Sequence, residues 1–319
     1  MRAAVITTPA TPPVCADFPE PEPLPGREPL GLVGAGLHQA VRGLAAGRHY
    51  GSEHAYPLVP GVDAVARTPE GRLVFTAFTR APWGTMAERL ATPFDVALPD
   101  GADPLAVAAG MNPGLSSWLV LTDRRAEVGA LDTVLVLGAT GMSGSMAVQS
   151  AFALGARRVI AAGRDPEALE RLRGLGATTV SLAETDPDAL AGALADAVAD
   201  TPPTLVLDYV WGPVAEASFA ALGRTGLGDD TADIAYVSIG TLAGSDAALP
   251  GALLRSRRIR VTGSGLGSVA RERIVAAIPE VMARLADGTL EAPYTIYPLR
   301  RVQEAWAHHG RTRAVIVPD

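Results

Sequence analysis

The second half of the chain alternates short apolar runs with longer amphipathic segments, and this pattern predicts most of its architecture. The runs are rich in β-branched residues and short enough to be buried parallel strands, whereas the segments between them are typical of helices. Strands are predicted at residues 133–137, 158–162, 204–209, 233–239 and 258–263. Helices are predicted at residues 145–154, 166–174, 187–198 and 213–222. Such alternation indicates a doubly wound parallel sheet with right-handed crossovers.

The first hundred residues follow a different pattern, with shorter alternating stretches and more prolines. Residues 2–7 predict a strand, residues 8–29 a loop with an edge strand, and residues 31–46 a strand that leads into a short helix. Residues 72–78 and 83–91 alternate like the strands of a small β-domain. The chain therefore combines a β-rich part with an α/β part.

Three further segments complete this prediction. Residues 104–121 are helical in pattern, with an interruption expected at Asn112, Pro113 and Gly114. A long amphipathic helix is predicted at about residues 269–286, and residues 294–318 have mixed strand and helix character.

A glycine-rich turn joins the first predicted strand of the α/β part to its first helix. Gly138, Gly141 and Gly144 lie three residues apart, directly after the apolar run 133–137. A helix N-terminus offers unpaired N–H groups and a partial positive charge, and glycine lets a pyrophosphate approach it. The context of strand, turn, helix and strand is the one that a dinucleotide-binding turn requires. The predicted cofactor contacts here are Gly138, Thr140, Gly141, Met142, Ser143 and Gly144. The alternative is a purely structural turn.

The end of the second strand bears on which nicotinamide cofactor is bound. An acidic residue about 20 residues after the glycines suits the 2′-hydroxyl of NAD, and an Arg suits the 2′-phosphate of NADPH. Gly163 leaves room for a phosphate, and Arg164 can form charge-assisted hydrogen bonds with it. Asp165 before Pro166 is typical of a helix N-cap. We therefore predict NADPH; the alternative is an exposed Arg164 with Asp165 binding NAD.

Composition and charge narrow the function classes. At 319 residues the chain is long enough for two domains, and its net charge of −7 argues against nucleic acids and anionic membranes as partners. All cationic side chains are Arg, which excludes lysine chemistry. The chain has a single cysteine, Cys15, and shows no apparent signal peptide and no apolar run of membrane-spanning length. These features predict a cytoplasmic protein that does not enter membranes.

No zinc site is expected. Cys15 lies far upstream of the position where a ligand would be needed, and Glu53 and His54 have no cysteine nearby. His308 and His309 are interpreted as the end of a helix near the surface rather than as a metal-binding pair.

Several motifs in the expected order resemble the zinc-free medium-chain dehydrogenase/reductases, in their quinone oxidoreductase-like branch. They are Tyr56-Pro57 with Pro60-Gly-Val-Asp63, Gly84-Thr-Met-Ala-Glu88, Gly138 to Gly144, Leu175-Gly-Ala177, Asp208 to Gly212, Ser238-Ile-Gly240 and His309 to Ala314. The resemblance implies a Rossmann-type NADP-binding domain at residues 115–265, inserted in a β-rich GroES-like catalytic domain at residues 1–114 and 266–319. It also implies a homodimer formed through edge strands near residues 258–263.

The same resemblance also implies candidate active-site residues in the β-rich part of the chain. Tyr50 matches a tyrosine of the family's active site, and His38 stands where many relatives have an asparagine near the nicotinamide. Either could touch the substrate or assist its protonation; the alternative for both is a role in orientation or packing. Val41 stands where these relatives have an aspartate, and Asp63 matches a family acid with a structural role. Arg313 matches a late basic residue that reaches a phosphate or ribose, or else is a solvated surface charge.

The remaining predicted contacts follow from the sheet itself. Open α/β sheets bind ligands at the carboxyl ends of their strands, so Gly240, Ser264 and Gly265 are expected to face the nicotinamide. The resulting prediction is an NADPH-dependent enzyme that transfers hydride to a small-molecule quinone or α,β-unsaturated carbonyl without metal. Two alternatives stay open: a zinc-free alcohol or aldehyde reductase, and an NADPH-binding, redox-responsive protein with little turnover.

Overall fold

The computed structural model describes residues 1–319 except Ala10, His54, Asp200 and Leu227. It divides into two compact units, residues 1–112 with 278–319 and residues 113–277. Helices α2 (Pro104–Val128) and α8 (Arg271–Ala286) each contribute to both units.

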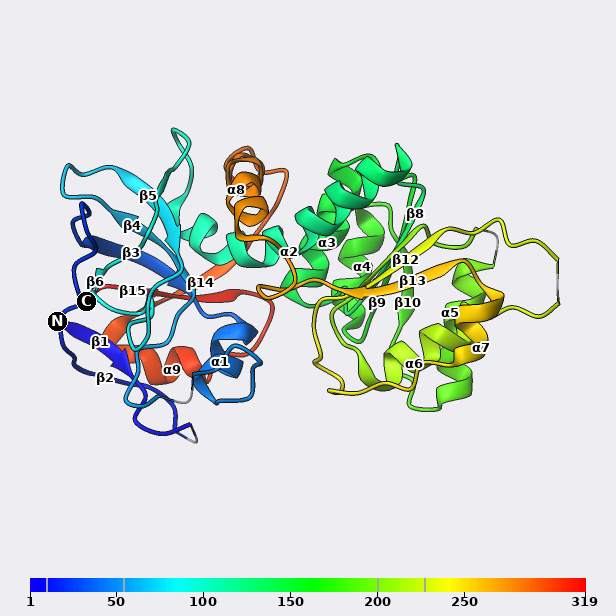
Figure 1. The fold of residues 1–319 in the computed structure, drawn as a ribbon, viewed down its shortest axis with the longest axis horizontal. Helices are drawn as coiled ribbons and strands as arrows, with labels where there is room; N and C mark the ends of the chain where they lie inside the picture. The colour runs from blue at the N-terminus through cyan, green and yellow to red at the C-terminus, as the bar shows by residue number, and fades with distance from the viewer. Residues whose placement is uncertain (10, 54, 200, 227) are drawn as a thin grey trace. The chain divides into compact units, whose positions relative to one another are not determined.

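The first unit is β-rich, as predicted. Its strands are β1 (Arg2–Val5), β2 (Val14–Asp17), β3 (Leu30–Gly36), β4 (Asp63–Arg67), β5 (Leu73–Ala77), β6 (Arg89–Leu90), β7 (Val96–Ala97), β14 (Tyr294–Pro298) and β15 (Arg313–Val317). Its shorter helices are α1 (Gln39–Ala45), the 3₁₀ helix Leu299–Arg301 and α9 (Val302–Trp306). The main sheet has the order β14-β15-β3-β4-β5-β7, with β6 beside β3, and β1 pairs with β2 (Figure 1).

The second unit is a parallel sheet with helices on both faces. Its strands are β8 (Thr133–Leu137), β9 (Arg158–Gly163), β10 (Thr178–Ser181), β11 (Leu205–Asp208), β12 (Ile234–Ser238) and β13 (Ile259–Gly263). Its helices are α3 (Met142–Ala153), α4 (Pro166–Gly174), α5 (Pro187–Val198), α6 (Gly212–Ala221) and α7 (Gly251–Ser256). The order β10-β9-β8-β11-β12-β13 places the first strand of the unit in the interior of the sheet.

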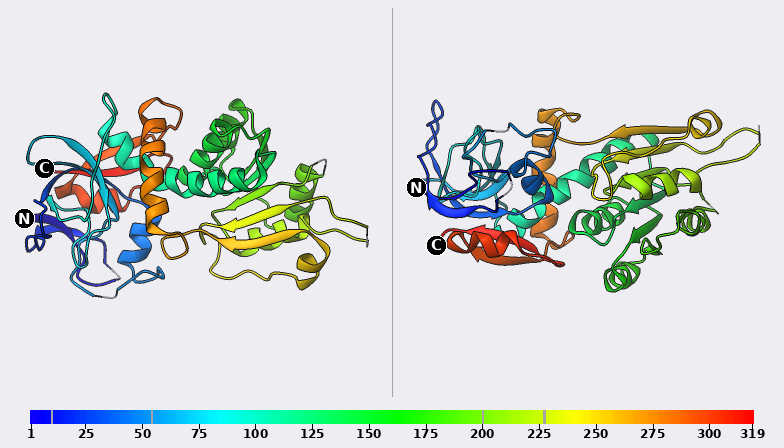
Figure 2. Two further views of the ribbon diagram at one scale, coloured as in Figure 1. Left: turned by 45° about the horizontal axis from the view of Figure 1, so that its top comes forward. Right: turned by 90° about the horizontal axis from the view of Figure 1, so that it is seen from below.

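The burial of β8 explains why this sheet forms. All five of its residues are buried, with Val134 and Val136 in the apolar cluster on one face and Leu135 and Leu137 in the cluster on the other. The first cluster includes residues of α2, α3 and α4, and the second includes residues of α5, α6 and α7. Helices therefore cover both faces of the sheet (Figure 2). A strand covered on both faces needs a continuous apolar run, which is the pattern that predicted it.

Helix α2 differs from its prediction. It continues without interruption through Asn112, Pro113 and Gly114, so the expected break is wrong. Judged by length and composition alone, it is long and apolar enough to cross a membrane. It is the one such helix among the described residues. However, 67% of its most apolar window is buried inside the protein, as in a core helix.

The predicted strand at residues 83–91 is also largely wrong, since only Arg89–Leu90 is a strand. The backbone of Met86 bonds to two separate segments: its carbonyl accepts from Ala4 N at 2.9 Å, and its N–H donates to Pro60 O at 3.0 Å. The alternation of apolar and polar residues at 83–91 therefore reflects burial between the segments of Ala4 and Pro60 rather than regular pairing in a sheet.

Candidate functional site

The glycine turn after β8 has the geometry of an anion cradle. Gly138 has φ of +87°, a conformation that favours glycine. The N–H groups of Gly138 and Ala139 both donate to the Ala162 carbonyl, at 2.9 and 2.8 Å, which ties the turn to β9. A Cβ on Gly144 would lie 2.2 Å from the Gly138 carbonyl oxygen, so only glycine lets the helix pack this closely on the turn. This explains two of the three glycines by backbone geometry.

The third glycine leaves the start of helix α3 open. Gly141 is the N-cap and supplies no side-chain cap, and the nearest atom to a Cβ there would be 3.7 Å away. The first N–H groups of a helix, here those of Met142, Ser143 and Gly144, have no intrahelical partners. Unpaired donors with no side chain over them suit a phosphate group. The described residues thus fit the pyrophosphate of a dinucleotide.

The end of β9 differs in one respect from the expectation. Gly163 is buried, and the space beside it is filled by Thr140 rather than left free for a phosphate. Arg164 is exposed, and its guanidinium is not bonded to any described residue. Asp165 accepts from the backbone N–H groups of Glu167 and Ala168, both at 3.0 Å, which confirms its interpretation as the N-cap of α4. Arg164 is therefore the side chain here that can bind an added anion.

The other strand ends offer fewer donors than expected. The N–H of Gly240 donates to Asp208 O at 3.1 Å, and that of Ser264 to Ser238 O at 2.9 Å. The N–H of Gly265 donates to Ser268 Oγ at 2.9 Å. These three amides are already used within the protein, so a ligand at these positions would meet carbonyl groups and side chains. Their contact with a nicotinamide stays a prediction.

In the first unit, His38 forms a buried pair with Asp63. His38 follows β3 and precedes α1, and its Nε2 lies 3.1 Å from Oδ1 of Asp63 at the start of β4. Both side chains are buried, and His38 Nδ1 has no hydrogen-bond partner among the described residues. Burial lowers the pKa of His38, although Asp63 opposes this effect. The imidazole is therefore neutral at pH 7, with Nε2–H donating to the carboxylate and Nδ1 left as an acceptor.

Arg313 lies close to this pair. Its guanidinium donates to Leu37 O at 3.1 Å, and its Nε is buried without a partner among the described residues. Burial lowers its pKa to about 10, so it remains charged at pH 7. A charged, partly unpaired guanidinium inside the protein fits an added anion.

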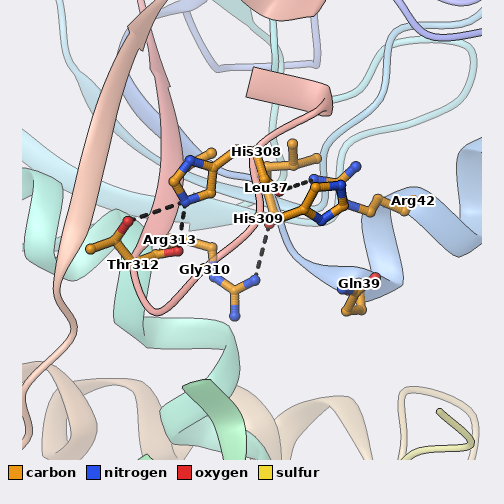
Figure 3. A pocket seen from close by; sticks show the side chains of 9 residues that line it. Leu37, Gln39, Arg42, His308, His309, Gly310, Thr312 and Arg313 are labelled. Atoms are coloured by element: carbon orange, nitrogen blue, oxygen red, sulfur yellow. Dashed lines mark hydrogen bonds between the residues drawn. The ribbon is translucent and has the colours of Figure 1, made fainter. Parts of the chain in front are cut away.

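A basic pocket in this unit includes Arg313 (Figure 3). Its volume is about 110 Å³. It is lined by Leu37, Gln39, Arg42, His308, His309, Gly310, Thr312, Arg313 and Ala314, none of them acidic. Arg42 donates to the carbonyls of Trp306 and His308 and lies over the Trp306 ring, which fixes it at the pocket. Arg42 was not predicted from the sequence, because 264 residues separate it from Trp306 and no local pattern connects them.

One of the two histidines of the pocket, His308, has structural partners. His308 Nδ1 lies 3.0 Å from the Tyr297 hydroxyl, and its Nε2 lies 3.0 Å from Thr312 O. His309 is exposed. Among the described residues, no group of three or more His, Cys, Asp or Glu side chains could hold a metal ion. His54, considered above with Glu53, lies outside the described residues.

Tyr50 does not join the groups around His38. It is 72% exposed and packs on His49, with 4.1 Å between ring centroids. It does not line the basic pocket, and its hydroxyl is not hydrogen-bonded to any described residue. Its role in catalysis stays a prediction.

The buried state of His38 predicts how stability depends on pH. The pKa of His38 in the folded protein lies below its ordinary value of about 6.5. Below that pH, His38 therefore binds a proton in the unfolded chain but not yet in the folded protein. We expect the melting temperature to fall as pH falls below about 6.5, and His38→Gln to flatten this dependence. Scanning calorimetry between about pH 7.5 and 5 measures it. His309→Gln, at an exposed histidine, should keep the wild-type slope; equal slopes in all three proteins would contradict the assignment.

Fold and site together define a class of protein. A six-stranded parallel sheet whose first strand lies in the interior, with a glycine turn at the start of the first helix, defines a dinucleotide-binding unit. The sequence matches the family model described as "Zinc-binding dehydrogenase" over residues 144–286. Most of that match lies within the second unit.

Similarity to curated proteins extends over the whole chain. A protein of Emericella nidulans described as a probable NADPH-dependent quinone reductase is 31% identical over 369 residues, covering 100% of both chains. The 5-exo-hydroxycamphor dehydrogenase of Pseudomonas putida is 41% identical over 126 residues, covering 38% of this chain and 34% of that protein. The chain therefore belongs to the medium-chain dehydrogenase/reductase family, in its quinone oxidoreductase-like branch.

Solved structures support the same placement. The quinone oxidoreductase of Thermus thermophilus, also solved with NADPH, has a TM-score of 0.78 and 29% identity, covering 99% of this chain and 100% of its own. A mycobacterial quinone oxidoreductase has a TM-score of 0.81 at 21% identity and full coverage of both chains, which shows a shared fold. The predicted fold class, a Rossmann-type sheet combined with a GroES-like domain, is confirmed.

Proposed function

We propose that the protein is an NADPH-dependent oxidoreductase that transfers hydride to a quinone or α,β-unsaturated carbonyl compound without zinc. The observation that carries the proposal is the end of β9, where Arg164 is exposed beside the glycine turn while Asp165 is used as a helix cap. The full-length similarity to a probable NADPH-dependent quinone reductase supports it.

NADPH supplies the hydride when it is bound, and the chain's own residues bind and orient it. The amides at the start of α3, from Met142 to Gly144, would hold the pyrophosphate, and Arg164 the 2′-phosphate. Arg313 would bind a further phosphate or ribose oxygen. Gly240, Ser264 and Gly265 would shape the site at the strand ends. Residues 115–265 would form the cofactor domain, and residues 1–114 with 266–319 the catalytic domain.

The proton that accompanies reduction is a separate question. A neutral His38 whose Nε2–H is held by Asp63 presents an acceptor at Nδ1, so it suits holding a donor group rather than giving a proton. The exposed Tyr50 hydroxyl, or solvent, is better suited to donate. We therefore assign His38 an orienting role and Tyr50 the protonation role.

The test is an acceptor panel with both cofactors and EDTA-treated protein. We expect NADPH to be oxidised by quinones and enones, with kcat/KM at least ~10-fold higher than with NADH, and no loss on EDTA treatment. Turnover only of simple ketones and aldehydes would favour the alcohol or aldehyde reductase, an alternative that the partial similarity to a dehydrogenase of Pseudomonas putida keeps open. Tight NADPH binding without turnover of any acceptor would favour the redox-responsive protein.

We also propose that the protein acts in the cytoplasm as a homodimer. The single cysteine suits a reducing compartment. Strand β13 is an edge of the parallel sheet, and paired edge strands of two copies would cover it.

A proline on this edge tests the dimer. The N–H of Ser264 donates to β12, so by alternation the N–H of Val261 points away from the sheet. Val261→Pro therefore removes a donor needed only for pairing with a second copy. We expect a dimer for the wild type and a monomer for the variant by light scattering. Thr179→Pro in β10, the opposite edge, should remain dimeric; a monomeric wild type would refute the proposal.

A further inference from the structure

Thr140 occupies the volume in which any side chain at position 163 would have to lie. Gly163 is the last residue of β9 and is buried. A Cβ there would be 2.3 Å from Thr140 Cγ2, 2.7 Å from its Oγ1 and 2.9 Å from its Cβ. The glycine turn and the end of β9 therefore meet through one threonine.

This contact cannot be relieved by turning the threonine side chain. Cγ2 and Oγ1 move when χ1 rotates, but the Cβ at 2.9 Å stays fixed to the backbone of the turn. The same side chain accepts from the N–H of Arg164, with Oγ1 and N 3.3 Å apart. Thr140 thus closes position 163 to a side chain and holds the backbone of the residue that follows it.

The steric closure of position 163 and the hydrogen bond to the Arg164 backbone both bear on which adenosine ribose the site accepts. In nicotinamide-binding sheets an acidic side chain at the end of the second strand receives the 2′-hydroxyl of the adenosine ribose. Here that position is sterically closed, and the next side chain, Arg164, is exposed and positioned by its backbone bond to Thr140. We propose that Thr140 is a positioning residue that sets the preference for 2′-phosphorylated over 2′-hydroxyl dinucleotides. This inference rests on the proposed function and adds a determinant to it.

The steric part is tested without any nucleotide. Gly163→Ala should lower the melting temperature by about 3–10 °C in the wild type, because a packed position is overfilled. In a Thr140→Gly background, Gly163→Ala should lower the melting temperature by less than about 2 °C. Gly192→Ala, in α5 with nothing within 4 Å of the added Cβ, should have no such dependence on residue 140. Equal costs of Gly163→Ala in both backgrounds would overturn the inference.

The specificity part is tested by calorimetric binding of adenosine 2′,5′-bisphosphate and adenosine 5′-monophosphate. Gly163→Asp alone should lose stability and gain no affinity for the monophosphate. The double variant with Thr140→Gly should fold and should reduce the wild-type preference for the bisphosphate by about tenfold or more, because a carboxylate then repels the phosphate and accepts from the hydroxyl. If Gly163→Asp alone produced this change, Thr140 would not be the determinant.

The two proposals fail in different ways. A wild-type protein that binds both probes equally would contradict the proposed NADPH dependence and with it the role of Thr140. A wild-type preference for the bisphosphate that the double variant leaves unchanged would refute the role of Thr140 alone.

Discussion

Replacing Gly144 by valine is expected to unfold the second unit locally and to abolish dinucleotide binding. A Cβ at this position would lie 2.2 Å from the Gly138 carbonyl oxygen and 2.6 Å from Ala139 Cα, which are both backbone atoms. The start of α3 would have to move away from the turn, and the amides at its N-terminus would move with it. We expect a loss of at least ~3 kcal/mol of unfolding free energy and a rise in Kd for NADPH of about 100-fold or more.

Circular dichroism melting and a fluorescence titration with NADPH measure the two effects. Gly144→Ala should have a stability and an NADPH affinity between those of the wild type and Gly144→Val, since it adds the colliding Cβ without the two methyl groups of valine. Gly174→Ala is the matched control, because this glycine ends α4 with nothing within 4 Å of the added atom. A Gly144→Val protein that melts like the wild type would show that the turn is not packed as described.

Replacing Arg164 by alanine is expected to raise the Kd for NADPH by about 10- to 100-fold and to leave that for NADH almost unchanged. The guanidinium is exposed and not bonded to any described residue, so its removal should cost little folding stability. Hydrogen bonds to a charged group are worth roughly 1.5–3 kcal/mol, which corresponds to this range of affinities. Parallel titrations with the two cofactors measure the difference.

Two controls separate the contact from the charge. Arg164→Lys keeps the charge but not the planar pair of donors, so it should recover part of the NADPH affinity. Arg171→Ala removes an exposed charge from the last turn of α4 and should change neither affinity by more than about twofold. Equal losses for NADPH and NADH in Arg164→Ala would indicate that this residue supports the fold rather than the 2′-phosphate.

The parts of the fold that the sequence predicted are those with strong apolar periodicity. Five strands of the parallel sheet and the helices α4 and α5 were predicted close to their observed bounds. Strand β10, Thr178–Ser181, was missed because it is an edge strand with only Val180 buried, so it has no apolar run. Helix α7, Gly251–Ser256, was missed because six residues with one buried side chain show no clear period. Helix α2 passes through Pro113 because burial of neighbours such as Met111 outweighs the lost hydrogen bond.

Candidate site residues close together in sequence were easier to find than those brought together by the fold. Gly138, Gly141 and Gly144 form a local motif, and the cap at Asp165 follows from its neighbours. By contrast, the contact between Thr140 and Gly163 joins two segments whose residues carry no pairing signal. The same holds for Arg42, which reaches the segment after α9 from helix α1.

The capping bonds of Asp165 have an evolutionary consequence. The acid nearest to the proposed ribose site is committed to holding two amides of α4, and the preceding strand end is closed to any side chain. A lineage that drifted toward the unphosphorylated cofactor would find no single substitution that places a carboxylate at position 163 without harming the fold. A carboxylate at the end of β9 therefore requires a permissive change at Thr140 before it can be acquired without loss of stability.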